Sequence, residues 1–339
     1  MSAFNKSTVV LGIESTAHTF SSSVVECNKP IHGNILSDIR RIYKPSEGSG
    51  IHPREASRHH ADNAAQTVRE SLDQANVHAN ELDAIAFSAG PGLGPCLRVG
   101  AMVARTLASY YSKPLIPVNH AVGHIELASM LTGANDPIVL LVSGGHTLTA
   151  AHSSGRWRVF GETLDITIGQ LIDQFGRETG LSSPCGPEVE KLAQKSSNYV
   201  QLPYTVKGND VSLSGVLTAA KRLLRSQNMI EDLASSIQET GFAMLTEVVE
   251  RSLAFLDKNE ILLTGGVAAN SRLQQMLEEM CAPRDVTLLT IPLKFSGDCG
   301  AQIAWTGLLA YKAGVNVALD DSAVRQSWRI DQVDTKWRS

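Results

Sequence analysis

The feature that most constrains the fold of this chain is a repeated order of strand, turn and strand. Residues 8–25 comprise an apolar strand, a short polar turn and a returning strand, and residues 138–149 show the same order with a glycine turn. At residues 261–270 another apolar strand runs into a Gly-Gly pair and then into a helix. The repetition predicts a duplicated α/β fold, in which ligands collect at the carboxyl ends of the strands.

Two of these turns, facing each other across a cleft, are suited to hold the phosphates of a nucleotide. The groups concerned are the backbone amides and small side chains at residues 15–18 and at Ser143, Gly144 and Gly145. An ordinary hairpin turn explains each segment as well. A further glycine-rich loop at residues 90–95 lacks the Lys-Ser/Thr of a P-loop. We expect that loop to bring the backbone close to a ligand or to another element.

Two histidines open a predicted helix directly after the short apolar run at residues 114–118. His120 and His124 are four residues apart, so a helix places both imidazoles on one face, where they can bind one metal ion. A partly buried pair without a ligand has the same spacing. Ala121 stands where the helix of a zinc peptidase carries its general base Glu, although Glu126 lies nearby. The spacing alone leaves both interpretations open.

The length of 339 residues indicates two domains or a duplicated fold. We expect domains at residues 1–130 and 131–320, with a basic insert near 38–60 in the first and a tail at 321–339. No apolar run approaches the ~20 residues that span a bilayer, and the N-terminus shows no signal-peptide pattern. This predicts a cytoplasmic protein without a membrane partner. The five scattered cysteines argue against disulfides and against a thiolate zinc site.

The net charge of −4 gives the chain no overall basic field, so binding of nucleic acid requires a local patch or another subunit. The densest cationic segment lies at residues 38–60, and a second group follows near residue 222. A solvated surface loop is the alternative for the first segment. The side chains concerned are Arg40, Arg41, Lys44, Arg54, Arg58, His59 and His60, and then Lys221, Arg222 and Arg225.

Ordered motifs along nearly the whole chain carry a resemblance to one family. They lie at residues 11–14, 90–94, 119–126, 142–145, 161–165, 202–208, 265–273 and 297–301. With these motifs the chain resembles the universal tRNA threonylcarbamoyladenosine transferase family, once described as O-sialoglycoprotein endopeptidases. The ending at residues 328–337 is similar to the archaeal and eukaryotic branch, in which this protein is the catalytic subunit of the KEOPS complex.

The resemblance implies the actin-like, Hsp70-like ATPase fold, with two duplicated ribonuclease-H-like domains around a nucleotide cleft. It also implies a catalytic centre in which one divalent metal ion, Fe²⁺ or Zn²⁺ with Mg²⁺ as a further option, is held by His120, His124 and Asp298. Two imidazoles and a carboxylate leave coordination sites open, as catalysis requires. Leu141 stands where the archaeal branch has a tyrosine ligand, and Cys299 stands where the family usually has Asn.

The resemblance assigns the nucleotide contacts as well. Phosphate would lie near the second turn, and ribose and adenine would lie near residues that follow it. The residues concerned are Ser143, Gly144 and Gly145 for phosphate, and Asp173, Gly186, Glu190 and Asn270 for ribose and adenine. Carboxylates can accept hydrogen bonds from both ribose hydroxyls. Without the resemblance, the two acids would be interpreted as a surface Asp on a helix and a Glu at the start of a helix.

The implied activity is acyl transfer from threonylcarbamoyl-AMP to the adenosine 3′ of the anticodon in tRNAs that read codons beginning with A. ATP and AMP analogues are related ligands. The implied partners are tRNA and KEOPS subunits, including a small protein kinase and a dimerising subunit. His146 or a metal-bound water is the candidate base. Two other classes remain open: a metallopeptidase, and a metal- and nucleotide-binding regulatory subunit, which is favoured if Leu141 and Cys299 abolish the metal.

Overall fold

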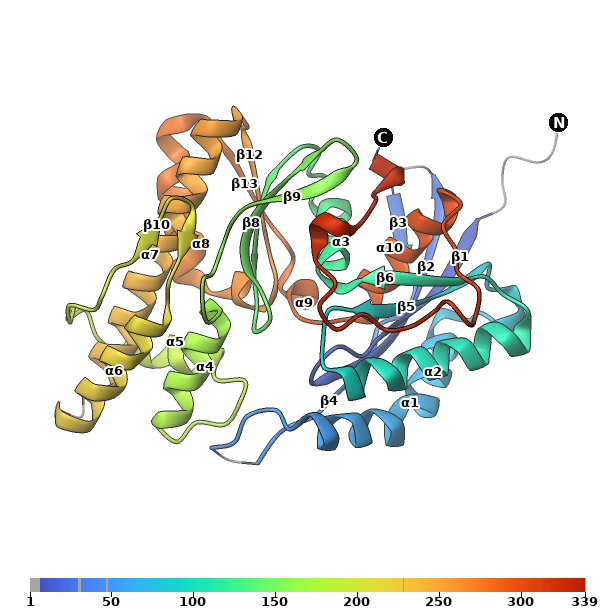
Figure 1. The fold of residues 1–339 in the computed structure, drawn as a ribbon, viewed down its shortest axis with the longest axis horizontal. Coiled ribbons are helices and arrows are strands. Elements are labelled where there is room, and N and C mark those ends of the chain that lie inside the picture. Colours follow the sequence, from blue (N-terminus) through green and yellow to red (C-terminus); the bar gives the residue numbers. More distant parts are fainter. Residues whose placement is uncertain (1–6, 30–31, 47, 228, 339) are drawn as a thin grey trace.

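The computed structural model describes residues 7–29, 32–46, 48–227 and 229–338. Residues 1–6 and 30–31 of the predicted first domain, residue 47 of the predicted basic insert, residue 228 of the predicted second domain and residue 339 of the predicted tail lie outside the described residues. Two mixed sheets form the centres of two lobes (Figure 1). The architecture is the duplicated α/β arrangement that the sequence predicts.

The first lobe is built on a six-stranded sheet. β1 (Thr8–Glu14) pairs antiparallel with β2 (Thr19–Lys29) and parallel with β5 (Ala84–Gly90). β6 (Leu115–Asn119) extends the sheet beside β5, and β3 (His32–Ile35) and β4 (Ile39–Ile42) both pair with β2. β1 is rich in β-branched residues and its centre is buried, which is typical of a strand covered on both faces.

The second lobe repeats this topology. β7 (Ile138–Val142) pairs antiparallel with β8 (Thr147–Ser153) and parallel with β12 (Glu260–Thr264). β9 (Arg156–Glu162) extends the sheet beside β8, and β13 (Thr287–Thr290) extends it beside β12. The strand orders β3-β2-β1-β5-β6 and β9-β8-β7-β12-β13 correspond position by position. The predicted duplication is therefore confirmed.

Helices cover both faces of each sheet (Figure 1). In the first lobe, α1 (Pro53–Ala75) and α2 (Gly94–Tyr111) pack on one face and α10 (Gly300–Lys312) packs on the other. In the second lobe, α7 (Ile230–Leu256) lies on the sheet and contacts an outer group of helices. That group comprises α4 (Ile168–Glu178), α5 (Gly186–Ala193), α6 (Ser214–Gln227) and α8 (Ser271–Cys281).

The remaining elements are short, apart from α3 (His120–Thr132), which lies between the lobes. Ala121 and Ile125 of α3 pack into the core of the second lobe, and Leu127 packs into the core beneath α10. The short elements are η1 (Ala79–Glu81), β10 (Val206–Lys207), β11 (Asp210–Val211), η2 (Gly266–Ala269), η3 (Ala282–Arg284), α9 (Leu293–Ser296), η4 (Ile330–Gln332) and η5 (Lys336–Arg338).

The elements predicted around the histidines are observed. The apolar run at residues 114–118 is β6, and the helix that His120 opens is α3. α10 falls within the predicted range 131–320 but packs against the first sheet. The domain boundaries themselves remain a prediction. Within the described residues, no helix has both the length and the apolar character needed to cross a bilayer.

Candidate metal centre

Two histidines at the start of α3 and an aspartate before α10 form a compact cluster between the lobes. The Nε2 atoms of His120 and His124 lie 3.5 Å and 3.2 Å from Oδ1 of Asp298. One donor atom from each of the three residues lies within 4.8 Å of the others. The structure therefore brings together the three residues that the sequence analysis assigned to a metal.

The local sequence explains why the two imidazoles share this position. Asn119 ends β6 and caps α3, because its Oδ1 accepts hydrogen bonds from the backbone amides of Ala121 and Val122. One helical turn then separates His120 from His124, so both rings face the same side. Asp298 joins them only because α10 packs against α3.

The orientation of His120 is fixed by residues of the first turn and of α10. Its Nδ1 donates to Oε2 of Glu14 at 2.8 Å, and Glu14 is fully buried at the end of β1. The hydroxyl of Thr16 and the amide of Gln302 lie 3.3 Å and 3.0 Å from the same nitrogen. A carboxylate on one ring nitrogen directs the other nitrogen toward a metal.

Burial and charge act differently on the clustered groups. Burial disfavours the imidazolium of His120, but the carboxylates of Glu14 and Asp298 outweigh that effect and raise its pKa to about 9. Burial lowers the pKa of His124, where Asp298 opposes it only in part. Burial also opposes ionisation of Asp298, but the neighbouring histidines hold its pKa well below the ordinary range. Two carboxylates thus face one cationic ring in a buried site.

These residues fit a divalent metal ion. Two imidazole nitrogens and one carboxylate are a donor set that suits Fe²⁺ and Zn²⁺, and three protein ligands leave further positions open. Glu14 supplies the outer carboxylate that metal-bound histidines commonly have. Nδ1 of His124 is buried and has no hydrogen-bond partner within the described residues. The chemistry of the donor set, rather than any single distance, supports the assignment.

The two departures from the family pattern leave this donor set intact. Leu141 is fully buried in β7 within the core of the second lobe, so it offers no ligand. Cys299 is also fully buried, and its thiol donates to Oε1 of Gln302 at 3.8 Å. Burial raises the pKa of Cys299 to about 12, so the group is a neutral thiol. Neither residue displaces Asp298.

The second glycine turn lies beside the cluster. The ring of His146 stacks on His120 with a centroid distance of 6.3 Å. Burial and the neighbouring histidines lower the pKa of His146 to about 3, and its buried Nδ1 has no partner within the described residues. Oγ of Ser143 accepts from the amides of Gly145 and His146. A Cβ built on Gly144 or Gly145 meets no atom within 4 Å, so the turn faces open space.

The residues predicted to hold ribose and adenine lie in two places, and in each a carboxylate accepts from a backbone amide next to a second predicted residue. Asp173 on α4 accepts from the amide of Cys185 at 2.9 Å, next to Gly186 at the start of α5. Glu190 on α5 accepts from the amide of Ser271 at 2.8 Å, next to Asn270. The side chain of Asn270 caps α8 and donates to Gln238. The contacts of these four residues with a nucleotide remain a prediction.

The predicted basic patches are partly neutralised within the chain. Arg40 pairs with Asp38 and Arg41 with Glu70, while His60 is buried. The exposed cations of the first patch are Lys44, Arg54 and Arg58. Glu178 at the end of α4 pairs with Lys221 of α6 at 2.8 Å and approaches Arg225 at 3.6 Å, beside a hollow of about 430 Å³.

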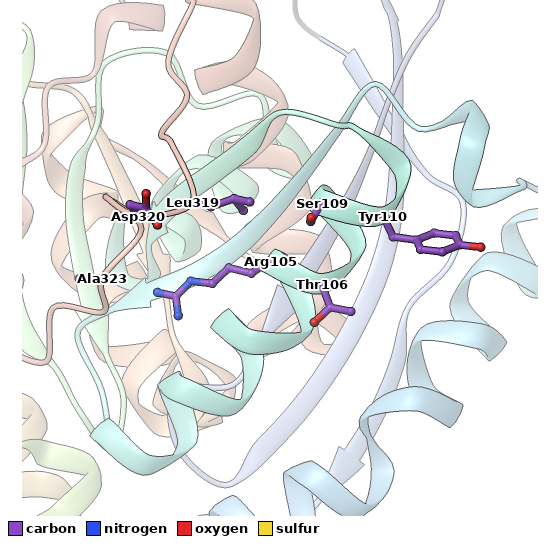
Figure 2. Close-up of a pocket in the computed structure, with 7 residues that line it drawn as sticks. All are labelled: Arg105, Thr106, Ser109, Tyr110, Leu319, Asp320 and Ala323. Atoms are coloured by element: carbon purple, nitrogen blue, oxygen red, sulfur yellow. The ribbon is translucent and has the colours of Figure 1, made fainter.

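A second surface hollow lies between α2 and residues 319–323, with a volume of about 740 Å³ (Figure 2). The guanidinium of Arg105 points toward this segment and donates to the hydroxyl and carbonyl of Ser322. Tyr110 also borders the hollow. None of the predicted site residues lines it.

Comparison with known proteins decides the family. A family model described as tRNA N6-adenosine threonylcarbamoyltransferase matches residues 32–305. The chain belongs to this family. The tRNA N6-adenosine threonylcarbamoyltransferase of Caldivirga maquilingensis is 50% identical over 97% of this chain and 98% of its own length. That of Thermofilum pendens is 47% identical over 97% of both chains. A probable bifunctional tRNA threonylcarbamoyladenosine biosynthesis protein of Methanothermobacter thermautotrophicus is 50% identical, and this chain covers 60% of it.

Solved structures agree on the fold of this threonylcarbamoyltransferase family member. The chain matches HypF of T. kodakarensis with a TM-score of 0.64 at 12% identity, over 91% of this chain and 48% of HypF. It matches an activator of 2-hydroxyisocaproyl-CoA dehydratase from Clostridium difficile with a TM-score of 0.54 at 12% identity, over 92% of this chain and all of the activator. The fold is the actin-like ATPase fold that the resemblance implies.

Two residues of the centre were not assigned a role from the sequence. Glu14 belongs to a motif of the threonylcarbamoyltransferase family, and a carboxylate at the end of a buried apolar strand is a signal that could have identified it. Gln302 gives no such signal, because a polar residue on a helix is ordinary. The structure also places Glu126 in contact with Arg338 and Trp157, so it is not free to act as a peptidase base.

Proposed function

We propose that this protein transfers the threonylcarbamoyl group from threonylcarbamoyl-AMP to N6 of the adenosine 3′ of the anticodon, in tRNAs that read codons beginning with A. The observation that carries the proposal is the cluster of His120, His124 and Asp298 in a chain of the threonylcarbamoyltransferase family. Because the acceptor is tRNA, we place the reaction in the cytoplasm. We propose KEOPS subunits, including a small protein kinase and a dimerising subunit, as partners.

The reaction needs no nucleophile from the protein. The amine nitrogen bonds to the carbamoyl carbon, the bond from that carbon to the phosphate oxygen breaks, and AMP leaves with the electron pair while the amine loses a proton. His120, His124 and Asp298 would hold a divalent ion, Fe²⁺ or Zn²⁺ with Mg²⁺ as a further option, which supplies Lewis-acid stabilisation of developing charge. Burial raises the pKa values of Cys185 and Cys299 to about 12, which suits thiols that take no part.

The chain's own residues would orient the two substrates. Gly144 and Gly145 present open backbone to the adenylate phosphate beside the cluster, and Asp173 and Glu190 would accept hydrogen bonds from the ribose. His146 is neutral, because its pKa is lowered to about 3. It is therefore a weak base, and its stacking on His120 suits a positioning role beside the acceptor amine better than proton removal.

The test is a direct assay of product. The purified chain is incubated with threonylcarbamoyl-AMP and unmodified tRNA, with and without KEOPS partners, and threonylcarbamoyladenosine is measured by mass spectrometry. We expect product with the unaltered chain and with His78→Ala, which removes an exposed histidine far along the chain from the cluster. We expect no product with His120→Ala. If the complete set of partners gives no product while the chain still binds nucleotide, the transferase proposal is wrong and a regulatory subunit is favoured.

A further inference from the structure

The C-terminal segment (residues 325–338) crosses both lobes and reaches the helix that carries the two histidines (Figure 1). It begins against the first lobe. The amide of Arg325 donates to the carbonyl of Ala89 at 2.7 Å, and the amide of Gly92 donates to the carbonyl of Gln326 at 3.2 Å. A Cβ on Gly90 would lie 1.9 Å from the carbonyl oxygen of Arg325. The glycine-rich loop at residues 90–95 therefore serves the close approach of this segment.

The same segment then attaches to the β8–β9 hairpin of the second lobe. Arg329 pairs with Glu162 of β9 at 3.1 Å. The amide of Thr335 donates to the carbonyl of Gly155 at 2.9 Å, and its hydroxyl lies 2.9 Å from Nε2 of His152. The segment thus has hydrogen bonds to both lobes within about fifteen residues, and α3 lies between its two attachments.

The first contact with α3 is at the helix N-terminus. Nδ2 of Asn119 donates to the carbonyl of Trp328 at 2.9 Å, while Oδ1 of the same side chain caps α3. Asn119 directly precedes His120. The side-chain amide of Asn119 therefore joins the start of α3 to the C-terminal segment.

The second contact is a buried ion pair on α3. Glu126 is only 3% exposed, and both its oxygens accept from Nε of Arg338, at 2.8 Å and 3.0 Å. Nε1 of Trp157 donates to Glu126 at 3.2 Å, and Nη2 of Arg338 donates to Ser129 at 3.0 Å. The guanidinium also lies 4.7 Å from the ring centroid of Trp157. A buried carboxylate is tolerated because it is paired and fully hydrogen-bonded.

The ion pair between Arg338 and Glu126 lies on a different side of α3 from the two histidines. At 3.6 residues per turn, Glu126 and Ser129 lie about 120–180° around the helix from His120 and His124. Arg338 therefore contacts the side of α3 that faces away from the cluster. A contact there opposes rotation of the helix about its own axis, which would move both Nε2 atoms relative to Asp298.

We propose that Arg338 is a positioning residue for the metal centre, acting through Glu126, with the contact between Trp328 and Asn119 as the second attachment. The C-terminal segment in this way fixes α3 so that His120 and His124 face Asp298 across the lobes. The inference rests on the metal site of the proposed function, but it does not depend on which group is transferred or on the acceptor.

The experiment compares Arg338→Ala, Glu126→Gln and the double variant in the full chain. Arg251→Ala is the matched control, because Arg251 pairs with Glu247 on the surface of α7 and does not touch α3. Zn²⁺ affinity is measured by competition with a chromophoric chelator, and hydrogen exchange of residues 120–132 is measured in the metal-free protein. We expect Arg338→Ala to weaken Zn²⁺ binding about 10-fold and to speed exchange in α3, with no change in the control.

The double variant should bind Zn²⁺ no more weakly than Arg338→Ala, because both changes remove the same contact. If Arg338→Ala does not fold, Arg338→Lys takes its place, since it keeps the charge but cannot donate from Nε and Nη2 together. A folded variant with unchanged exchange in α3 and unchanged Zn²⁺ affinity overturns the inference. If the unaltered chain binds no Zn²⁺, the metal site fails, and exchange in α3 still decides whether Arg338 fixes this helix.

Discussion

The turns that follow β1 and β7 occupy equivalent places in two sheets of the same topology, yet they are used differently. In the first turn, Glu14 and Thr16 point to His120, and the carbonyl of Ala17 accepts from His60 at 3.0 Å. In the second turn, Gly144 and Gly145 border open space. The first turn orients a ligand of the proposed metal, and the second leaves its backbone available to a substrate.

The packing of α10 explains the difference. α10 lies against β1, where a Cβ on Gly12 would meet the amide nitrogen of Ala304 at 2.2 Å. α4 packs against the second turn, where a Cβ on Gly169 would lie 2.5 Å from the carbonyl oxygen of Ser143, but among the described residues no atom lies within 4 Å of a Cβ on Gly144. A duplicated backbone therefore provides two similar turns, and the helix packed against each one decides which becomes a support and which becomes a binding surface.

The largest effect is expected from removing Asp298, the proposed metal ligand that lies between the two lobes. Asp298→Ala should lower both metal content and transferase activity by more than about 100-fold, which exceeds the loss typical of outer residues. Metal content is measured by mass spectrometry of the purified protein, and activity by tRNA modification. Asp62→Ala, which removes an exposed carboxylate on α1, serves as the control. Full metal content in Asp298→Ala would show that the cluster is not the metal site.

A smaller effect should distinguish the two turns. Glu14→Gln should weaken Zn²⁺ binding about 10–100-fold, because the neutral amide no longer stabilises the proton on Nδ1 of His120. Ser143→Ala in the second turn should leave Zn²⁺ affinity unchanged, because within the described residues Oγ of Ser143 accepts from the amides of Gly145 and His146 in its own turn and not from His120 or His124. Chelator competition measures the Zn²⁺ affinity of both variants. Equal losses in the two variants would contradict the division of roles.

Two alanine substitutions test the packing. Gly12→Ala should lower the free energy of unfolding by about 1–3 kcal/mol, because the backbone of α10 leaves no room for a Cβ. Gly144→Ala should leave stability within about 0.5 kcal/mol and raise the KM for threonylcarbamoyl-AMP, because its methyl group enters open space. Denaturant unfolding measures the stability of both variants, and steady-state kinetics measure the KM of Gly144→Ala. A stability loss in Gly144→Ala would show that the second turn is also filled.

At neutral pH the smallest effect comes from His60 on α1, because its influence on stability appears only as the pH falls. Burial, together with neighbouring His59 and His18, lowers the pKa of His60 to about 4, against about 6.5 when unfolded. Between these values the unfolded chain binds a proton that the folded chain excludes. Stability is therefore kept above pH 6.5 and falls as the pH drops, by at most about 1.4 kcal/mol per unit. The free energy of unfolding is measured from pH 7 to 4 for the unaltered chain and for His60→Gln. Parallel pH dependences of the two proteins would show that His60 is not the group responsible.

The local patterns of the sequence were sufficient for much of the architecture. The repeated order of strand and turn predicted two sheets of one topology, because alternating burial and turn residues act over short distances. The spacing of His120 and His124 predicted a shared face, because helix periodicity is local. The family motifs added Asp298 to that pair, and the cluster confirms the grouping.

Tertiary structure decided what surrounds those residues. Glu14 meets His120 across 106 residues and Arg338 meets Glu126 across 212, and no periodicity links positions so far apart. The charge pattern near residues 38–60 predicted a basic patch, yet Asp38 and Glu70 neutralise part of it after folding. The sequence by itself determined most of the elements and the shared face of the two histidines. Only the packing of α10 and of the C-terminal segment against α3 determined how that pair is held, because those contacts depend on surfaces formed by folding.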